Sequence, residues 1–378
     1  MIKEKRFSPF LKWPGGKEKE LNYIHEYLPN DIENYYEPFV GGGAVYLSLD
    51  ARRYFVNDKS LDLICLYELI KINDKDFFNN LYKIDKCWSD IGKYILNNGS
   101  VYKELYKKFK NNHIDLEKLK LEIIDVLDND AELFSNMIAD DLFHEKNVFI
   151  QELKRGVFDK YKRMKKIEKQ KGMLPNEDII DNILGSMKSS FYMYIRYLYN
   201  KKNIASNKAE RTSYFYFIRE YCYSGMFRFN KNGDFNVPYG GIAYNKKSFS
   251  KKVERMKDEN LINHLKTTEL YNLDFEEFLD NSKLNDADFI FLDPPYDTEF
   301  STYDKNIFDS NSQKRLANYL LNKCNAKWML VIKNSDLIFE LYSNKDGIDI
   351  FSFEKKYLVS FMNRNDKDVQ HLVIRNYQ

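Results

Sequence analysis

The chain has 378 residues, and its 59 Lys and Arg against 57 Asp and Glu leave a formal net charge of only +2. A composition that is 43% hydrophobic and 16% aromatic excludes a mainly disordered protein. No run of about 18 apolar residues predicts a membrane span, and the first residues lack the apolar stretch of a secretion signal. The four Cys form no CxxC pair and the five His no HExxH motif. We therefore expect a cytoplasmic protein with neither a disulfide framework nor a catalytic metal.

The first 70 residues predict an α/β unit. Helices are expected over 18–27, 44–51 and 61–71, and strands over 34–40 and 54–56. The first strand runs into three glycines and the second into an acid. This order of strand, glycines, helix, strand and acid is typical of a nucleotide-binding βαβ unit.

Residues 71–187 predict a helical insertion, because apolar residues recur at helical spacing and Gly and Pro are few. Charge separates along this segment. Residues 101–150 carry 7 Lys and Arg against 11 Asp and Glu, whereas residues 151–170 carry 8 against 3. The excess of +5 in 151–170 fits either a solvated helix face or a contact with nucleic-acid phosphates.

Residues 188–241 combine rings with cations. Thirteen aromatic residues lie between Phe191 and Phe229, and 187–230 carries 8 Lys and Arg against 2 Asp and Glu, an excess of +6. Basic side chains bind phosphates and aromatic faces stack on unpaired bases, so the mixture suits a nucleic-acid surface. Part of it must be helix core, because several of these rings can fall on buried faces.

The α/β alternation returns in the last third of the chain. Strands are expected over 288–292 and 328–332 with a helix over 312–323 between them, and 356–362 with 369–375 predict a terminal β-hairpin. The fold class is therefore α/β: one Rossmann-like sheet with a terminal β-hairpin, into which two segments are inserted.

The motif Asp293-Pro294-Pro295-Tyr296 follows the 288–292 strand directly, at the edge where open α/β sheets place ligands. The amino nitrogen of a nucleobase is a poor nucleophile, because its lone pair is delocalised into the ring. Two acceptors, the Asp293 carboxylate and a carbonyl fixed by the prolines, favour the tetrahedral geometry needed to attack a methyl group. Tyr296 offers a face to an extruded base. The alternative is a strand end that the prolines merely terminate.

The segment EPFVGGG, from Glu37 to Gly43, places glycines at a turn where the backbone can approach a ligand closely. It lacks the third glycine of a dinucleotide fingerprint, and no GxxxxGK[ST] occurs in the chain. Asp58, just after the next strand, is placed to accept from ribose hydroxyls. These features predict a nucleoside-bearing cofactor without a pyrophosphate, which S-adenosylmethionine fits. The glycines alone equally suit a plain tight turn.

Three motifs in this order, FLKWPGGK at 10–17, EPFVGGGAV at 37–45 and FLDPPY at 291–296, make the chain similar to the Dam-type (class alpha) family of DNA adenine-N6 methyltransferases. A fourth match, RFNKNGDFNVPYG at 228–240, resembles the target-recognition segment of that family. The resemblance implies transfer of a methyl group from S-adenosylmethionine to N6 of a flipped adenine in double-stranded DNA. It implies neither a metal nor an obligate protein partner, and it places the protein on the DNA of the cytoplasm.

The resemblance assigns residues to three groups. Asp293, Pro294, Pro295 and Tyr296 would hold and activate the flipped adenine. The cofactor site would comprise Trp13, Lys17, Glu37, Phe39, Gly41, Asp58, Asp274, Phe275 and Asp293. Contacts with DNA would come from Lys12, Tyr223, Arg228, Asn236 and Pro238. Arg228 would read a guanine bidentately, and Tyr223 would fill the space left by the flipped base or, alternatively, lie in the core.

The implied organisation is a catalytic core over 1–70 and 242–378, a helical insertion over 71–187 and a target-recognition region over 188–241. The insertion is longer than compact members of the family carry, and Ser224 stands where they often have Asn. GATC, or a site that contains it, is therefore one of several candidate target sites.

Three other functions fit the motifs less well. An RNA or protein methyltransferase is disfavoured, because relatives of that kind more often carry Asn in place of Asp293. A non-catalytic DNA-binding regulator is disfavoured by the intact Asp58, Asp293 and Tyr296. A fusion with a restriction nuclease finds no convincing pair of nuclease carboxylates with a lysine in the insertion.

Overall fold

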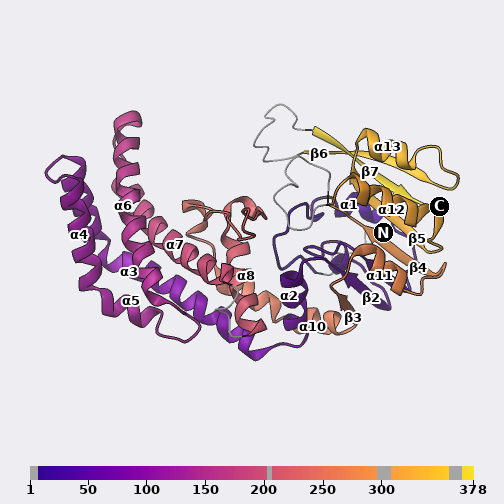
Figure 1. Cartoon of the computed structure of the whole chain (residues 1–378), viewed down its shortest axis with the longest axis horizontal. Coiled ribbons are helices and arrows are strands. Elements are labelled where there is room, and N and C mark those ends of the chain that lie inside the picture. Colours follow the sequence, from indigo (N-terminus) through magenta and orange to yellow (C-terminus); the bar gives the residue numbers. More distant parts are fainter. Residues whose placement is uncertain (1–6, 202–206, 296–307, 357–367) are drawn as a thin grey trace. The chain divides into compact units, whose positions relative to one another are not determined.

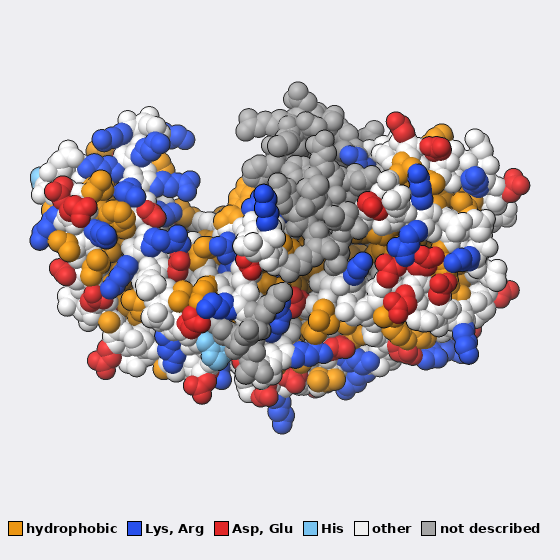
Figure 2. All heavy atoms as spheres, in the orientation of Figure 1, with side chains coloured by type: hydrophobic (Ala, Val, Ile, Leu, Met, Phe, Trp, Pro, Cys, Tyr) orange, Lys and Arg blue, Asp and Glu red, His pale blue; other side chains and the backbone are white. Residues whose placement is uncertain are grey.

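The computed structural model describes residues 7–201, 207–295, 308–356 and 368–378 (Figure 1). The chain forms two compact units, composed of Met1–Ile72, Phe227–Gly233 and Met256–Gln378 for the first and of Asn73–Met226 and Asp234–Arg255 for the second. Helices from both inserted ranges of the sequence, 71–187 and 188–241, thus belong to the second unit. Acidic and basic side chains are interspersed over the visible face of the molecule (Figure 2), in keeping with the small net charge.

The first unit is built on a seven-stranded sheet with the order β3-β2-β1-β4-β5-β7-β6. Its strands are β1 (Asn34–Glu37), β2 (Arg53–Asn57), β3 (Thr268–Tyr271), β4 (Asp288–Leu292), β5 (Lys327–Lys333), β6 (Asp349–Lys356) and β7 (Asp368–Arg375). β1 to β5 pair in parallel, whereas β7 runs antiparallel to both β5 and β6. The strand order reverses between β1 and β4, which is the switch point where open α/β sheets bind ligands. The predicted α/β class is confirmed.

Alternation along the strands sends side chains to two covered faces of this sheet. Tyr36 of β1 and Trp328 of β5 belong to a core cluster beneath α11 (Phe275–Asn281), α12 (Ser310–Asn322) and α13 (Asp336–Tyr342). Tyr35 faces the other way, where it meets Tyr54 of β2 at a ring-centroid distance of 6.1 Å. The helices of the first unit outside the core cluster are α1 (Leu21–Tyr27), α2 (Leu61–Lys71) and α10 (Glu259–Lys266).

The predicted helix over 44–51 is wrong. The segment holds only one 3-10 turn, η1 (Tyr46–Ser48), before Leu49 becomes extended. Residues 41–49 are all buried, whereas a helix that covers a sheet exposes one face to solvent. The other predicted elements up to residue 71 are present, with α1 starting three residues later than expected. β3, with its two polar residues in four, was not anticipated.

The terminal hairpin is present, but its first strand was misplaced. β6 ends where the predicted strand 356–362 was to begin, and it pairs with β7 from Asp349↔Arg375 to Lys356↔Asp368. Residues 357–367 lie outside the described part of the chain. The earlier position has a packing reason, because Phe351 and Phe353 of β6 contact Tyr27 and Tyr23 of α1, with ring centroids 4.6 and 5.4 Å apart.

The second unit is helical, as predicted for 71–187. Its helices are α3 (Lys75–Lys110), α4 (Leu116–Asn129), α5 (Ala131–Met137), α6 (Lys146–Lys171), α7 (Asn176–Asn200), α8 (Lys208–Tyr221) and α9 (Phe249–Met256). α6 and α7 approach closely at Gly156, where a Cβ atom would lie 2.3 Å from the Ser190 Oγ. Within the described residues, no helix combines the length and apolar character needed to cross a membrane.

The rings of the 188–241 segment build this unit's core. Of the 13 aromatic residues between Phe191 and Phe229, ten are buried, and Tyr197, Tyr223 and Phe227 are the three that are not. Trp88 of α3 lies among them, 4.4 Å from the Tyr221 ring centroid. The interpretation of these rings as a base-stacking surface is therefore wrong for most of them, because they fill the space between helices.

Candidate active site

A cavity of about 350 Å³ lies at the carboxyl ends of the parallel strands of the first unit. Its volume is in the range of small-molecule sites, about 300–1,000 Å³. The nine residues predicted to bind a cofactor all line it: Trp13, Lys17, Glu37, Phe39, Gly41, Asp58, Asp274, Phe275 and Asp293. Pro294 and Pro295 of the predicted catalytic motif line it as well, whereas Tyr296 lies outside the described residues.

The glycines after β1 let Trp13 pack directly on the backbone. Gly41 has φ +47°, and a Cβ atom there would lie 2.6 Å from Cδ1 of Trp13. Gly43 has φ +70°, and its Cβ would lie 2.5 Å from the Tyr67 hydroxyl. Both conformations are strained for residues other than glycine. The turn therefore needs glycine for two reasons, its left-handed backbone and the aromatic side chains that touch it.

Asp58 joins this turn to the end of β2. One carboxylate oxygen accepts the N–H of Gly41 at 3.0 Å, and the other accepts the N–H of Ser60 at 2.8 Å. The preceding residue, Asn57, donates to the carbonyls of Pro38 and Leu273 at 3.0 and 3.1 Å. These hydrogen bonds connect the carboxyl ends of β1, β2 and β3. They also fix the Asp58 carboxylate in the lining of the cavity.

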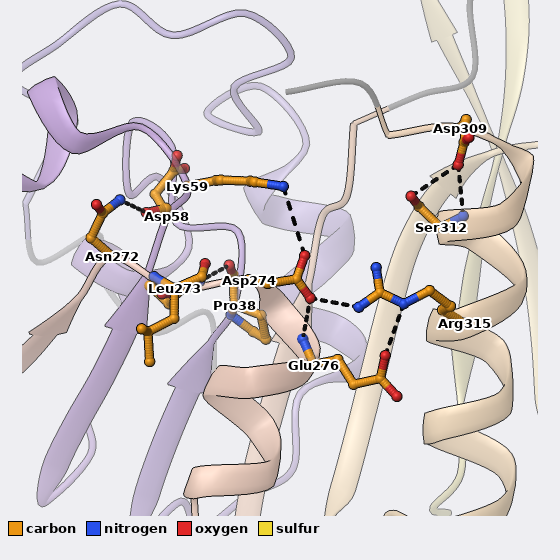
Figure 3. Close-up of polar contacts among 11 residues, drawn as sticks. Pro38, Asp58, Lys59, Asn272, Leu273, Asp274, Glu276, Asp309, Ser312 and Arg315 are labelled. Atoms are coloured by element: carbon orange, nitrogen blue, oxygen red, sulfur yellow. Dashed lines mark hydrogen bonds and ion pairs between the residues drawn. The ribbon is translucent and has the colours of Figure 1, made fainter. Parts of the chain in front are cut away.

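Asp274 and Phe275 start α11, where Asp274 caps the helix by accepting the N–H of Glu276. Arg315 of α12 donates to Asp274 Oδ1 at 2.7 Å and to Glu276 Oε2 at 2.9 Å, and Lys59 Nζ lies 3.8 Å from Asp274 Oδ2 (Figure 3). The Arg315 guanidinium also lies over the Phe275 ring, 4.9 Å from its centroid. A ligand that hydrogen-bonds to Asp274 must therefore share this carboxylate with cations of the protein.

Lys17 and Asp293 form an ion pair in the cavity. The Lys17 ammonium donates to Asp293 Oδ1 and, at 3.1 Å, to the carbonyl of Gly15. Lys17 is only 2% exposed. On the other side of the motif, the buried Gln313 of α12 donates to the Pro295 carbonyl at 3.3 Å. The Asp-Pro-Pro segment is thus held at both ends by side chains from distant parts of the sequence.

Glu37 is buried at the end of β1 and accepts a hydrogen bond of 2.6 Å from the Tyr35 hydroxyl. Burial raises the pKa of Glu37 well above its ordinary value, and the negative charge of Asp293 raises it further. The Tyr35 hydrogen bond and the Lys17 charge oppose that rise without cancelling it. The protonated form of Glu37 is therefore favoured beside the Lys17–Asp293 pair.

Phe227 is a cavity residue that the sequence did not reveal. It lines the cavity and packs on Trp13, with ring centroids 5.1 Å apart. Its neighbour along the chain is Arg228, the residue predicted to read a guanine. The only signal for Phe227 in the sequence is its position next to the 228–240 motif, because no pattern in the sequence predicts its contact with Trp13.

The predicted DNA contacts fall on both units. Lys12 and Arg228 belong to the first, and Lys12 is exposed. Tyr223, Asn236 and Pro238 belong to the second. Tyr223 is 36% exposed and begins a 3-10 turn, η2 (Tyr223–Gly225). The alternative of a core tyrosine therefore does not hold.

Side chains of α7 and α8 form hydrogen bonds to the backbone next to Tyr223, Asn236 and Pro238. On α7, Tyr192 and Arg196 both donate to the Val237 carbonyl, at 2.8 and 3.0 Å, and Asn200 exchanges two hydrogen bonds with the Phe235 backbone. On α8, the fully buried Arg219 donates to the carbonyls of Met226 and Gly225 at 2.6 and 2.9 Å. Much of the positive charge of 187–230 thus binds carbonyls rather than facing solvent.

Comparisons with known proteins point to one family. The D12 class N6 adenine-specific DNA methyltransferase family matches residues 13–183 and 161–359. The chain is similar to the Type II methyltransferase M.CviBI of Paramecium bursaria Chlorella virus NC1A, at 26% identity over 374 residues that cover 98% of this chain and 99% of that protein. It is equally similar to the Type II methyltransferase M.MjaIII of Methanocaldococcus jannaschii, at 26% over 390 residues with the same coverage. The DNA adenine methylase of Haemophilus influenzae is 45% identical over 65 residues, 17% of this chain and 23% of that protein.

Proposed function

The chain belongs to the D12 class N6 adenine-specific DNA methyltransferases, and we propose that it takes its methyl group from S-adenosylmethionine and acts on an adenine flipped out of double-stranded DNA. Adenine methylation of DNA follows from the family. The observation that carries the further assignment is the Lys17–Asp293 ion pair, which shares one cavity with Trp13, Asp58 and Phe275.

The cavity residues fit S-adenosylmethionine by their chemistry. When bound, this cofactor supplies a methyl group activated by a sulfonium. A carboxylate offers about four acceptor positions, so Asp58 can bind ribose hydroxyls while it holds Gly41 and Ser60. The Phe39 and Phe275 rings, 5.5 Å apart, offer apolar surface to a purine.

Asp293 and the two prolines would activate the adenine amino group. Lys17 holds one oxygen of the Asp293 carboxylate, and we assign a hydrogen of the amino group to the other. The Pro294 carbonyl would accept the second hydrogen, in a turn that Gln313 fixes through Pro295. The adenine nitrogen would bond to the methyl carbon while the bond of that carbon to the sulfonium sulfur breaks and its electron pair stays on sulfur, and the nitrogen would then lose a proton to water. Because that nitrogen has become acidic, Asp293 acts by orienting and polarising rather than as a strong base.

Target recognition would fall to Lys12, Arg228, Asn236 and Pro238, with Tyr223 filling the space of the flipped base. Extrusion costs a few kcal/mol, which an exposed ring and phosphate contacts can offset. We propose GATC, or a site containing it, as the first target to test. By analogy with relatives named Type II methyltransferases, we propose a role in a restriction–modification system, acting on cytoplasmic DNA.

Transfer of labelled methyl groups to unmethylated duplex DNA tests the proposal, followed by sequencing that maps N6-methyladenine. We expect transfer at one short sequence and its loss in Asp293→Ala, with Asp286→Ala, an exposed acid before the same strand, as the matched control. Binding of S-adenosylmethionine, followed by calorimetry, is expected to persist in Asp286→Ala and to weaken in Asp293→Ala, which leaves the buried Lys17 without its partner. A wild-type protein that binds cofactor and duplex but methylates no duplex contradicts the proposal.

A further inference from the structure

Exposed positive charge is concentrated on α6, outside the predicted recognition region of 188–241. This helix carries ten Lys and Arg against three Asp and Glu in its 26 residues. The cations of α7 and α8 are different, since Lys188 and Arg219 are buried and bind backbone carbonyls. Figure 2 shows Lys and Arg side chains gathered over the region of α6 and α4, at the upper left of the view.

Four of the α6 cations form one row, which we call the α6 stripe: Arg155, Lys162, Lys166 and Lys169. All four are exposed, and their spacing of 7, 4 and 3 residues keeps them on one face of the helix. The opposite face is the buried one, formed by Phe149, Leu153, Val157, Tyr161 and Met164. At 1.5 Å per residue the stripe is about 21 Å long.

The protein itself compensates this charge only in part. Arg155 pairs with Glu152 and Lys162 with Asp159, through exposed contacts of the kind that contribute about 0–1 kcal/mol. Among the described residues, no ion pair is formed by Lys166 or Lys169.

Neighbouring cations of α6 also act on one another. Burial lowers the pKa of Lys165, and the charge of Lys169 lowers it further. Burial and the charge of Arg163 lower the pKa of Lys160 in the same way.

Within the second unit, the helix that carries the stripe packs on α7, which holds the 234–240 part of the recognition segment. α6 and α7 touch at Gly156, and Ser190 of α7 donates to the Glu152 carbonyl at 2.8 Å. Burial lowers the pKa of Arg196, which binds the Val237 carbonyl, and the charge of Arg155 lowers it further. α7 thus connects the helix of the stripe to the backbone that carries Asn236 and Pro238.

We propose that the α6 stripe binds the phosphates of duplex DNA that flanks the methylated site. This inference rests on the proposed function. It adds a contact that does not depend on base sequence and that lengthens the stretch of DNA bound by the protein. Duplex DNA is the partner of choice because its phosphates recur every 3.4 Å along a strand, so the stripe spans about six base pairs. Such contacts raise affinity without changing which base is read.

The test compares wild type with Lys162→Gln/Lys166→Gln/Lys169→Gln and with a control of equal charge change, Lys283→Gln/Lys327→Gln/Lys345→Gln, at exposed positions of the first unit. Exposed substitutions of this kind change stability by about 0.5 kcal/mol or less. Binding and single-turnover methylation are measured on duplexes of about one and three helical turns, ~10 and ~30 base pairs, with the target at the centre. Salt is varied for each.

For the stripe variant we expect affinity for the long duplex to fall at least about tenfold, and the slope of log K against log salt to fall by about 0.9 per lost contact. Affinity for the short duplex, the methylated sequence and the single-turnover rate at saturating DNA should match wild type. The inference is overturned if the stripe variant loses as much affinity for the short duplex as for the long one, or if the control variant loses as much affinity for the long duplex as the stripe variant does. If wild type itself methylates no duplex, it is the proposed function that fails.

Discussion

The Lys17 ammonium donates to Oδ1 of Asp293 across 276 positions of sequence. Lys17 is 2% exposed and Asp293 18%. Breaking such a largely buried pair by removing one partner leaves a charge without compensation, at a cost of about 3–5 kcal/mol. The pair therefore ties the N-terminal motif to the Asp-Pro-Pro motif, and the two act as one unit.

We expect Asp293→Asn to lower the single-turnover rate of methyl transfer about 10²-fold or more, because the amide no longer polarises the amino group as a carboxylate does. Lys17→Gln should lower the same rate, and the double variant should be little worse than the worse single variant. A double-mutant cycle on the rate measures this coupling. Additive effects of the two substitutions would show that the pair does not act as a unit.

Gly41→Ala is expected to weaken cofactor binding and destabilise the fold. The new Cβ would lie 2.6 Å from Trp13, in addition to the left-handed strain of about 1–2 kcal/mol. Gly347→Ala is the matched control, because Gly347 has φ +73° but a Cβ atom there would meet nothing within 4 Å. Calorimetric binding and thermal unfolding of both variants give the comparison. Equal losses in the two would mean that backbone strain alone explains Gly41.

Phe227→Ala should raise the dissociation constant of S-adenosylmethionine about 2- to 12-fold, because the Trp13 ring loses a partner worth about 0.5–1.5 kcal/mol. Since Arg228 is adjacent, we also expect more methylation of near-cognate sites. Phe339→Ala, on an exposed ring of α13, serves as the control. An unchanged dissociation constant together with unchanged site preference would exclude this role for Phe227.

Arg315→Lys should weaken cofactor binding by less than about fivefold. Arg315 bridges Asp274 and Glu276 but its side chain is 46% exposed, so solvent screens the pair to about 1 kcal/mol or less. The effect should appear in the KM for S-adenosylmethionine and leave kcat near wild type, because Arg315 orients Asp274 rather than the reacting atoms. A fall in kcat with an unchanged KM would count against this positioning role.

Glu37→Gln should change how stability depends on pH. The folded-state pKa of Glu37 is raised, so its protonated form is favoured on folding. That contribution is complete below the ordinary Glu pKa of about 4.3 and is lost as pH rises through the elevated value. Gln cannot ionise, so the unfolding free energy of the variant should gain on wild type as pH rises from about 5 to 9. Denaturant unfolding across that range checks it, and parallel profiles would contradict it.

Sequence order was enough to predict the α/β class and the carboxyl-end position of Asp293, because strand–turn motifs carry their own local geometry, whereas the set of nine cavity residues came from the resemblance to a known family. The helix over 44–51 failed for a reason that is not local, namely that tertiary packing buries all of residues 41–49. Strand β6 was misplaced because its position depends on contacts with α1. Phe227 and Arg315 were missed because their roles depend on tertiary contacts, with Trp13 for Phe227 and with Asp274 for Arg315, which no residue pattern predicts.

The positions of the charged residues show most clearly what the sequence determines and what the tertiary structure decides. The sequence by itself determined the signs and positions of 59 cations and 57 anions, and with its motifs the adenine-methylating chemistry. It pointed to 187–230 as the basic surface and left 151–170 open between a solvated helix face and a phosphate contact. Tertiary structure placed Lys188 and Arg219 inside, on carbonyls, and left the α6 stripe exposed. The physical reason is that a buried cation needs hydrogen-bond acceptors inside the protein. Which cations are buried depends on how the helices pack.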